Sequence, residues 1–418
     1  MSLETTITTI AKDAKRASRV LAQSSTAAKN RALHAMAVGL RRAERRLLAA
    51  NAGDVAAGRR AGLSAALLDR LTLTPQRIEE MCRGIEQVAG LPDPVGAVLR
   101  QWRRPNGLRI RKVRVPLGVI GIIYESRPNV TADCAALCLK SGNSTILRGG
   151  SEALRSNRAI ADVLRASLRA AGLPAAAIAV LPTTDRRSID LLTTMTRYVD
   201  LIIPRGGESL IRRVAAHATV PVIKHYKGVC HTYVDRAADL KKADAIVFNA
   251  KVQRPATCNA METLLVHRQV AARFLPVALR HLQSAGVELR GDAATRRLVP
   301  GVTPATAADW SAEYLDLILA VKVVGSECEA IEHINRYGTA HSDAIVTEQR
   351  ERAQRFLEEV DSACVYVNAS TRFTDGFQFG LGAEIGISTE KIHARGPMGL
   401  EELTTYKYEV IGNGQIRQ

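Results

Sequence analysis

Cys258 lies in the segment whose residue types could best support a chemical reaction. It lies in the run QRPATCNAMET (253–263), after a proline at position 255 and before the apolar residues 264–266. A thiol between a rigid turn and a strand is held in place, and its reactive thiolate needs an electropositive or dipole-rich setting. Arg254 is close in sequence, and the amides of 257–259 could point at a developing oxyanion. Most cysteines outside disulfides fill space as small hydrophobes, and this segment alone favours that interpretation.

Two glycines at a strand-to-helix turn are candidates for binding a phosphate. Gly206 and Gly207 follow an apolar run, and a helical pattern begins at Ser209. Glycine lets backbone N–H groups and a helix N-terminus approach an anion closely. The segment has only two glycines where a dinucleotide fingerprint has three, and such turns also carry glycine for steric reasons. Glu208 suits the helix dipole but would repel a phosphate unless it points away.

Two further polar groups stand at the ends of predicted elements. Arg148 opens the run RGGSE (148–152) directly after a strand, where its guanidinium would suit a ribose phosphate. An arginine that caps a loop is the alternative, and by itself the segment favours it. Asn129 precedes a helix predicted from residue 131 and has the character of an N-cap. Its amide could also be a second oxyanion donor opposite Cys258.

The elements that must position these groups follow from hydrophobic periodicity. Residues 1 to about 92 have helical spacing, with helices predicted at 27–50 and 65–90. From Val113 the pattern alternates between short apolar strands and helices, which predicts parallel sheets covered on both faces. The predicted strands are 119–124, 144–147, 177–181, 199–203, 232–234, 264–266, 287–290, 318–324, 343–346, 365–368 and 404–411. The predicted helices of this part are 131–140, 153–171, 209–218, 239–250, 271–285, 327–337 and 349–360.

Composition excludes several classes of protein. The net charge is +17, but the basic residues are scattered and only 4% of residues are aromatic, so we expect no nucleic-acid partner. No apolar run reaches the ~18 residues of a membrane span, and the N-terminus lacks a secretory pattern. Seven cysteines without a CxxC pair indicate the reducing cytoplasm. Cys134 and Cys138 have no further ligands near them in sequence, so we predict packing roles for both and no metal site.

Four long blocks carry a resemblance to a known family. They read YESRPNVT (124–131), QRPATCNAMET (253–263), YVNASTRFTDG (366–376) and HARGPMGL (393–400). With the order of strands, helices and glycine turns, they resemble the γ-glutamyl phosphate reductases of the aldehyde dehydrogenase superfamily over nearly the whole chain. The resemblance implies an α/β fold of the aldehyde dehydrogenase type. Its expected parts are a Rossmann-type cofactor domain (1–222), an α/β catalytic domain (223–375), and a site-lining loop with a small β oligomerisation arm (376–418 with 102–115).

The resemblance also implies roles for matching residues. Cys258 would be the nucleophile and Asn129 an oxyanion donor. The expected cofactor residues are Arg148, Ser151 and Glu152 at the adenosine ribose, Gly206 and Gly207 at the pyrophosphate, and Asp316 at the nicotinamide ribose. For the anionic substrate our candidates are Arg254, Ser370, Thr371 and Arg372.

One departure from the superfamily indicates the direction of the reaction. Oxidising members have a Glu-Leu-Gly-Gly-Lys segment whose glutamate activates water, whereas this chain has Lys224 at the glutamate position and His225 next to it. A protonated lysine cannot be a general base. His225 as a substitute base is the less favoured alternative to a structural or phosphate-facing role for both residues. The thioester is therefore expected to be formed from an acyl phosphate and reduced.

The resulting hypothesis is an NADPH-dependent reduction of L-glutamyl 5-phosphate to L-glutamate 5-semialdehyde in proline biosynthesis, with release of phosphate. The biosynthetic direction and Arg148 favour NADPH over NADH. One alternative is a related acyl-phosphate or CoA-dependent aldehyde dehydrogenase, and another is a basic nucleic-acid-binding protein without catalysis. The expected partners are a second copy of the chain and a glutamate 5-kinase that supplies the labile substrate.

Overall fold

The computed structural model describes residues 2–417, which form two compact units. The first unit comprises Met1–Lys224, Gly380–Gly386 and Met398–Gln418, and the second comprises His225–Phe379 and Ile387–Pro397. The chain therefore passes from one unit to the other at Lys224, and the C-terminal segment 376–418 is divided between them.

The first unit contains a four-stranded parallel sheet in the order β5-β4-β3-β6. Its strands are β3 (Val119–Tyr124), β4 (Ser144–Arg148), β5 (Ile178–Val180) and β6 (Leu201–Arg205). One face packs against α1 (Leu3–Leu21), α8 (Arg187–Thr194) and α9 (Glu208–His217) in a common apolar cluster. The other face is covered by α6 (Asn129–Lys140) and α7 (Leu154–Ala170). Because β3 leads to β4 on one side and β6 lies on its other side, the carboxyl ends of β3 and β6 flank a topological switch point, where open α/β sheets bind ligands.

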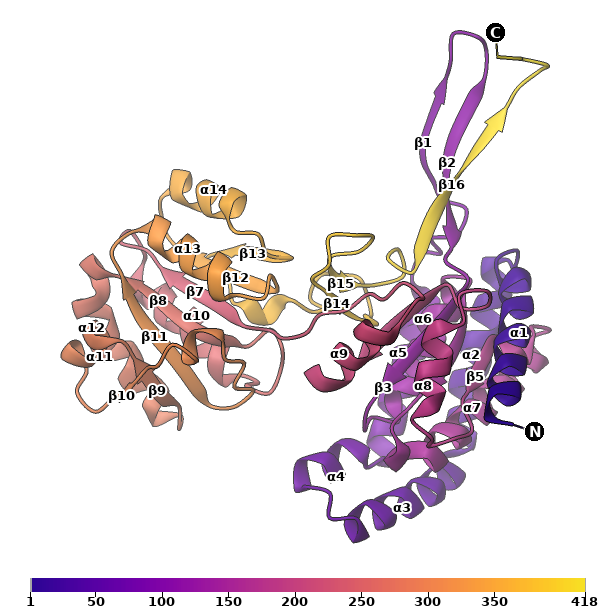
Figure 1. The fold of residues 1–418 in the computed structure, drawn as a ribbon, viewed down its shortest axis with the longest axis horizontal. Helices are drawn as coiled ribbons and strands as arrows, with labels where there is room; N and C mark the ends of the chain where they lie inside the picture. Colours follow the sequence, from indigo (N-terminus) through magenta and orange to yellow (C-terminus); the bar gives the residue numbers. More distant parts are fainter. Residues whose placement is uncertain (1, 418) are drawn as a thin grey trace. The chain divides into compact units, whose positions relative to one another are not determined.

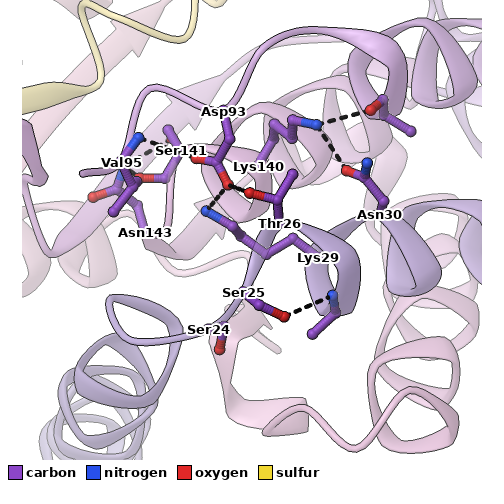
Figure 2. A network of polar contacts seen from close by, with 12 residues as sticks. Ser24, Ser25, Thr26, Lys29, Asn30, Asp93, Val95, Lys140, Ser141 and Asn143 are labelled. Atoms are coloured by element: carbon purple, nitrogen blue, oxygen red, sulfur yellow. Dashed lines mark hydrogen bonds and ion pairs between the residues drawn. The ribbon is translucent and has the colours of Figure 1, made fainter. Parts of the chain in front are cut away.

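The N-terminal helices form an outer layer on the α6–α7 face. They are α2 (Thr26–Arg42), α3 (Glu44–Arg60), α4 (Ala65–Leu71) and α5 (Pro75–Gly90). Figure 2 shows the polar network beneath them. The buried ammonium of Lys29 lies 2.6 Å from Asp93, and Lys140 at the end of α6 donates to Asn30 (2.7 Å) and to the Ala89 carbonyl (2.8 Å). The ammonium of Lys29 is thus paired with a carboxylate and that of Lys140 with two neutral oxygens, and the network ties the outer layer to α6, whose first turn carries a predicted site residue.

The second unit is built on a seven-stranded parallel sheet in the order β10-β9-β11-β8-β7-β12-β13. The strands are β7 (Cys230–Val234), β8 (Met261–His267), β9 (Glu288–Gly291), β10 (Thr303–Pro304), β11 (Ile318–Val324), β12 (Ser342–Val346) and β13 (Cys364–Val367). Apolar residues of α10 (Leu240–Val252) and α11 (Arg268–Ser284) pack on one face, beside α12 (Ala293–Leu298). A separate cluster joins α13 (Glu327–Tyr337) and α14 (Arg350–Glu359) to the sheet. The expected α/β fold is confirmed.

A three-stranded antiparallel sheet of the first unit forms an arm in the order β1-β2-β16 (Figure 1). Its strands are β1 (Val98–Arg103), β2 (Arg109–Pro116) and β16 (Thr404–Ile411), and Tyr406 pairs with Arg114. Two short strands, β14 (Gly386–Ser388) and β15 (Gly396–Met398), pair in the glycine-rich segment before it.

Several boundaries differ from the sequence-based predictions for identifiable reasons. The predicted helix 65–90 is two helices, because Thr74 caps α5 by accepting a hydrogen bond from the Arg77 amide and Pro75 occupies the first helical position. The predicted helix 27–50 breaks at Ala43. Helices α8 and α12 lie in segments that carried no prediction. Among the helices of residues 2–417, none is both long and apolar enough to span a bilayer.

Candidate active site

Cys258 lies in the turn between α10 and β8, at the carboxyl end of a helix and the start of a buried strand. Cys258 is half-buried. Among the other six cysteines, Cys328 is exposed, and the buried ones are Cys82, Cys134, Cys138, Cys230 and Cys364. The turn is held locally: the Thr257 hydroxyl donates to the Arg254 carbonyl (2.8 Å). Ala260 closes it by donating its N–H to the Thr257 carbonyl (3.0 Å). The turn is therefore held in place while Cys258 is only partly buried, which is the setting that the predicted nucleophile requires.

The backbone of Cys258 is packed against Gly228. A Cβ placed on Gly228 would lie 1.8 Å from the carbonyl oxygen of Cys258, so only glycine fits there. The Gly228 N–H donates to Glu313 Oε1 (2.7 Å), and Cys230 donates its S–H to the Cys258 carbonyl (3.2 Å). Burial raises the pKa of Cys230 well above its ordinary value, so this second thiol stays protonated. Cys230 and Glu313 thus position the Cys258 turn, and sequence reasoning gave neither a role.

Two imidazoles lie beside the thiol. One ligand atom each of His225, Cys258 and His341 falls within 4.8 Å of the other two. The His225 Nδ1 is 2.8 Å from the Ile387 carbonyl, and the two rings meet edge to face with centroids 5.5 Å apart. Burial, reinforced by the charge of His225, lowers the pKa of His341 to about 3. His341 is therefore a neutral imidazole at physiological pH, whatever its role.

Arginines give this site its charge. Burial lowers the pKa of Arg372, the charge of Arg254 lowers it further, and Cys258 opposes both effects, which places all three groups within electrostatic reach. The Arg372 Nε donates to Gln253 Oε1 (3.0 Å). Two guanidiniums beside one thiol attract its thiolate form and can bind an anionic substrate through charge-assisted hydrogen bonds.

The two predicted hydroxyl residues next to Arg372 are buried and already bonded. Thr371 is fully buried and donates its hydroxyl to the Asn259 carbonyl (2.7 Å). Ser370 is 4% exposed and its hydroxyl accepts the Arg372 N–H (3.3 Å). Asn259 in turn donates its amide to the Thr374 carbonyl (2.8 Å). These bonds connect the segment 370–374 to the turn that carries Cys258. The segment therefore helps to position this turn, and a contact of either hydroxyl with substrate would be a second role.

Five of the six predicted cofactor residues, all but Asp316, lie in the first unit, at the end of β4 and in the segments that follow β4 and β6. Arg148 ends β4, and its two terminal nitrogens donate to the carbonyls of Gly149 (3.0 Å) and Thr184 (3.2 Å). Burial lowers the pKa of this guanidinium, and the charges of Arg186 and Arg213 act in the same direction. Arg148 therefore braces two loops at the edge of the sheet, as the loop-capping alternative supposed, with two further arginines close by.

Glu152 organises the loop after β3. Its Oε1 accepts the Ser126 N–H (2.8 Å) and the Ser126 hydroxyl (2.6 Å), and Ser126 has a positive φ of 41°. Ser151 is exposed, and its hydroxyl is 3.5 Å from Glu152 Oε2. The second carboxylate oxygen and the exposed hydroxyl remain available to a ribose.

The glycine turn after β6 begins α9 and holds a carboxylate. The Gly207 N–H donates to Glu125 Oε2 (2.9 Å), and a Cβ on Gly206 would lie 2.5 Å from the same oxygen. A negatively charged oxygen thus sits at a helix N-terminus that only glycine leaves open, which is the environment a phosphate requires. The fit to a dinucleotide pyrophosphate is good, provided that Glu125 moves aside.

Asn129 and Asp316 lie in different surroundings from those predicted. Asn129 is the first residue of α6 and does not cap it; Pro128 holds the cap position, and the Asn129 amide donates to Asp133 Oδ2 (3.0 Å). The N-cap interpretation is therefore wrong, because the helix starts two residues earlier than its apolar pattern. Asp316 is exposed before β11 and accepts the N–H of its neighbour Leu317 (2.7 Å), whereas Glu313 contacts the nucleophile's turn through Gly228.

Comparisons with known proteins agree on one family. The sequence model of the Aldehyde dehydrogenase family matches residues 2–298 and 302–408. The chain is 57% identical to the γ-glutamyl phosphate reductase of Moorella thermoacetica over all 418 residues, which is 100% of both chains. It is 58% identical to that of Halothermothrix orenii, with 98% of each chain covered. The crystal structure of γ-glutamyl phosphate reductase from Thermotoga maritima superposes with a TM-score of 0.97 at 51% identity, covering 99% of this chain and 100% of that one.

Proposed function

The chain belongs to the aldehyde dehydrogenase family, and on that premise we propose that it reduces L-glutamyl 5-phosphate to L-glutamate 5-semialdehyde with NADPH and releases phosphate. The observation that carries the proposal is a half-buried cysteine within electrostatic reach of two arginines, in a chain more than half identical to γ-glutamyl phosphate reductases over its full length. The step belongs to proline biosynthesis, which takes place in the cytoplasm.

The first half-reaction forms a thioester on Cys258. The thiolate attacks the acyl carbon, the Cys258 N–H and the Asn129 amide stabilise the oxyanion, and the carbon–oxygen bond to phosphate breaks. Arg254 and Arg372 hold the anionic substrate. Phosphate is a good leaving group and needs no strong acid.

The second half-reaction reduces that thioester. The family uses a nicotinamide cofactor, which supplies a hydride to the acyl carbon when bound. Glu152 and Ser151 would hold its adenosine ribose, and the turn at Gly206 and Gly207 its pyrophosphate. Hydride addition leaves an oxyanion on the acyl carbon, which takes up a proton transiently and returns it as the carbonyl forms. The carbon–sulfur bond then breaks, the aldehyde leaves and Cys258 regains its thiolate.

We assign that proton transfer to His225. Imidazole exchanges protons near neutral pH, and His225 lies beside the sulfur. A ligand atom of His341 also lies within 4.8 Å of the sulfur, but burial lowers the pKa of His341 to about 3, so its ring is not an imidazolium that could act as the acid near neutral pH. We also propose Glu313, in place of Asp316, as the carboxylate at the nicotinamide ribose. Glu313 accepts a hydrogen bond from Gly228, and Gly228 packs against the backbone of Cys258.

The reverse reaction tests the proposal directly. Glutamate semialdehyde and NADP⁺ should produce reduced nicotinamide, followed by absorbance, only when inorganic phosphate is present. Coenzyme A should not replace phosphate. Turnover with CoA and none with phosphate would identify the CoA-dependent alternative instead.

Replacing Arg186 tests the preference for NADPH over NADH more sharply than replacing Arg148 does. Arg148 has two of its nitrogens bonded to carbonyls, whereas Arg186 is exposed nearby and is our candidate for the adenosine 2′-phosphate. Arg186→Ala should raise the KM for NADPH about tenfold, as expected for one charged hydrogen bond, and leave the KM for NADH unchanged. Arg148→Ala should instead impair both cofactors. If the wild-type enzyme preferred NADH, the assignment of Arg186 to the adenosine 2′-phosphate would be wrong.

We also propose that the arm mediates a homo-oligomer. Its outer strand β16 exposes Tyr408, Val410 and Ile411, and an unpaired edge with apolar side chains is a template for another chain. The double substitution Tyr408→Lys and Val410→Lys should reduce the mass found by light scattering to that of one chain. A wild-type monomer would refute the assembly. A glutamate 5-kinase partner is the finer part of this proposal, and comigration of the two proteins in size-exclusion chromatography tests it.

A further inference from the structure

The thiol of Cys258 and the imidazoles of His225 and His341 form a compact set of metal ligands. The three residues come from segments up to 116 positions apart, and their ligand atoms lie within 4.8 Å of one another. We propose that this set binds a zinc ion reversibly, and that bound zinc inhibits the enzyme by occupying the nucleophile. The inference goes beyond the proposed function, since it concerns a ligand that is neither substrate nor cofactor.

The ligand types and spacing suit zinc. Zinc binds thiolate sulfur at about 2.3 Å and imidazole nitrogen at about 2.0–2.1 Å in tetrahedral geometry. Those bond lengths place neighbouring ligand atoms about 3.3–3.7 Å apart, so side-chain rotations that bring the three atoms about 1 Å closer complete the site. Three protein ligands leave the fourth position to water, as in exchangeable zinc sites.

Hydrogen bonds already orient both rings for a metal. Metal-bound histidines usually donate their second ring N–H to a carbonyl or another oxygen, which fixes the tautomer. Here Nδ1 of His225 faces the Ile387 carbonyl at 2.8 Å, and Nδ1 of His341 faces Ser342 Oγ at 2.8 Å. The Nε2 of His341 is buried without a hydrogen-bond partner among residues 2–417. A nitrogen lone pair in that position is costly to leave unused, and a metal ion would satisfy it.

Electrostatics and protonation decide how tightly the ion is held. Imidazole binds a metal ion through its neutral form. The Cys258 thiol releases one proton as its bond to zinc forms, and no electron is transferred. Arg254 and Arg372 repel the cation, so binding should be weaker than at a structural zinc site and a chelator should reverse it. The Cys230 S–H is engaged by the Cys258 carbonyl at 3.2 Å, so this thiol is not among the proposed ligands.

Cobalt(II) is the probe that reports the ligands directly. One equivalent of Co²⁺ added to the whole protein should produce a thiolate-to-cobalt charge-transfer band and the strong visible bands of tetrahedral coordination. Cys258→Ser should abolish the charge-transfer band, and His341→Gln should weaken Co²⁺ binding about tenfold or more. Cys328→Ser, which removes an exposed thiol, should leave the spectrum unchanged. A band that survives in Cys258→Ser would overturn the proposal.

Alkylation provides a second test that needs no variant. Zn²⁺ should slow the reaction of iodoacetamide with Cys258, followed by mass spectrometry of its peptide, while Cys328 reacts at an unchanged rate. Equal slowing at both cysteines, or none at Cys258, would contradict a specific site. Neither measurement uses substrate or cofactor, so the metal site can fail while the phosphate-dependent reaction stands, and the reverse.

Discussion

Replacing Cys258 by serine or alanine abolishes phosphate-dependent oxidation of glutamate semialdehyde, with an expected loss in kcat of at least about 10³-fold. The sulfur is the only proposed covalent attachment point for the glutamyl group. Without it neither the thioester nor the thiohemiacetal forms, and the remaining groups can only bind the reactants. Steady-state kinetics in the semialdehyde direction measure the loss.

The fold and the cofactor site should survive this change. Cys258 lies in the second unit, whereas the residues proposed for the adenosine ribose and the pyrophosphate lie in the first, so the Kd for NADP⁺ should stay within about twofold of wild type, as expected for independent sites. Cys328→Ser is the matched control, since it removes an exposed thiol from the same unit and should keep full activity. Wild-type turnover by Cys258→Ala would disprove the nucleophile.

Gly228→Ala should also reduce kcat strongly, by displacing the turn that holds Cys258 and not by removing a reacting group. The added methyl carbon would lie 1.8 Å from the oxygen, 2.5 Å from the carbonyl carbon and 2.7 Å from the Cα of Cys258. All three are backbone atoms, so no side-chain rotation relieves the clash and the turn itself must shift. A displacement of about 1 Å costs about 10²-fold in rate.

Three measurements separate this effect from unfolding. Rapid kinetics should show the fall in kcat, iodoacetamide should show altered reactivity of Cys258, and thermal melting should show a folded protein. Gly90→Ala is the matched control, because a Cβ there meets no atom within 4 Å and the backbone is helical. Normal kcat in Gly228→Ala with an unchanged melting temperature would mean that Gly228 does not support the nucleophile.

Local sequence was sufficient for much of the architecture. Buried parallel strands consist of short apolar runs because both of their faces are covered. Each apolar run that we predicted as a strand, beginning with residues 119–124, is a strand in the structure. Helix ends were harder to predict. Asn129 shows why: its helix begins with residues whose apolar spacing is weak, and the capping interpretation assumed a start at residue 131.

The chemistry of Cys258 depended on contacts that no local pattern contains. His341 stands 83 positions after Cys258, and a single histidine in an apolar segment carries no sign of a nearby thiol. No local pattern indicates a role for Glu313 either, since its hydrogen-bond partner Gly228 is 85 residues away along the chain. Arg148 was correctly placed at a strand end, but its bond to the Thr184 carbonyl 36 residues away could not be foreseen.

By itself, the order of apolar runs, glycine turns and family-like blocks determined the fold and the family and singled out Cys258 as the candidate nucleophile, because these follow from residues that are neighbours along the chain. Only the tertiary structure decided which groups surround that nucleophile: the imidazoles, the supporting glycine and the paired guanidiniums. Parallel strands bring their carboxyl ends and connecting turns together from distant parts of the chain, so the environment that gives a thiol its reactivity is a property of the folded sheet.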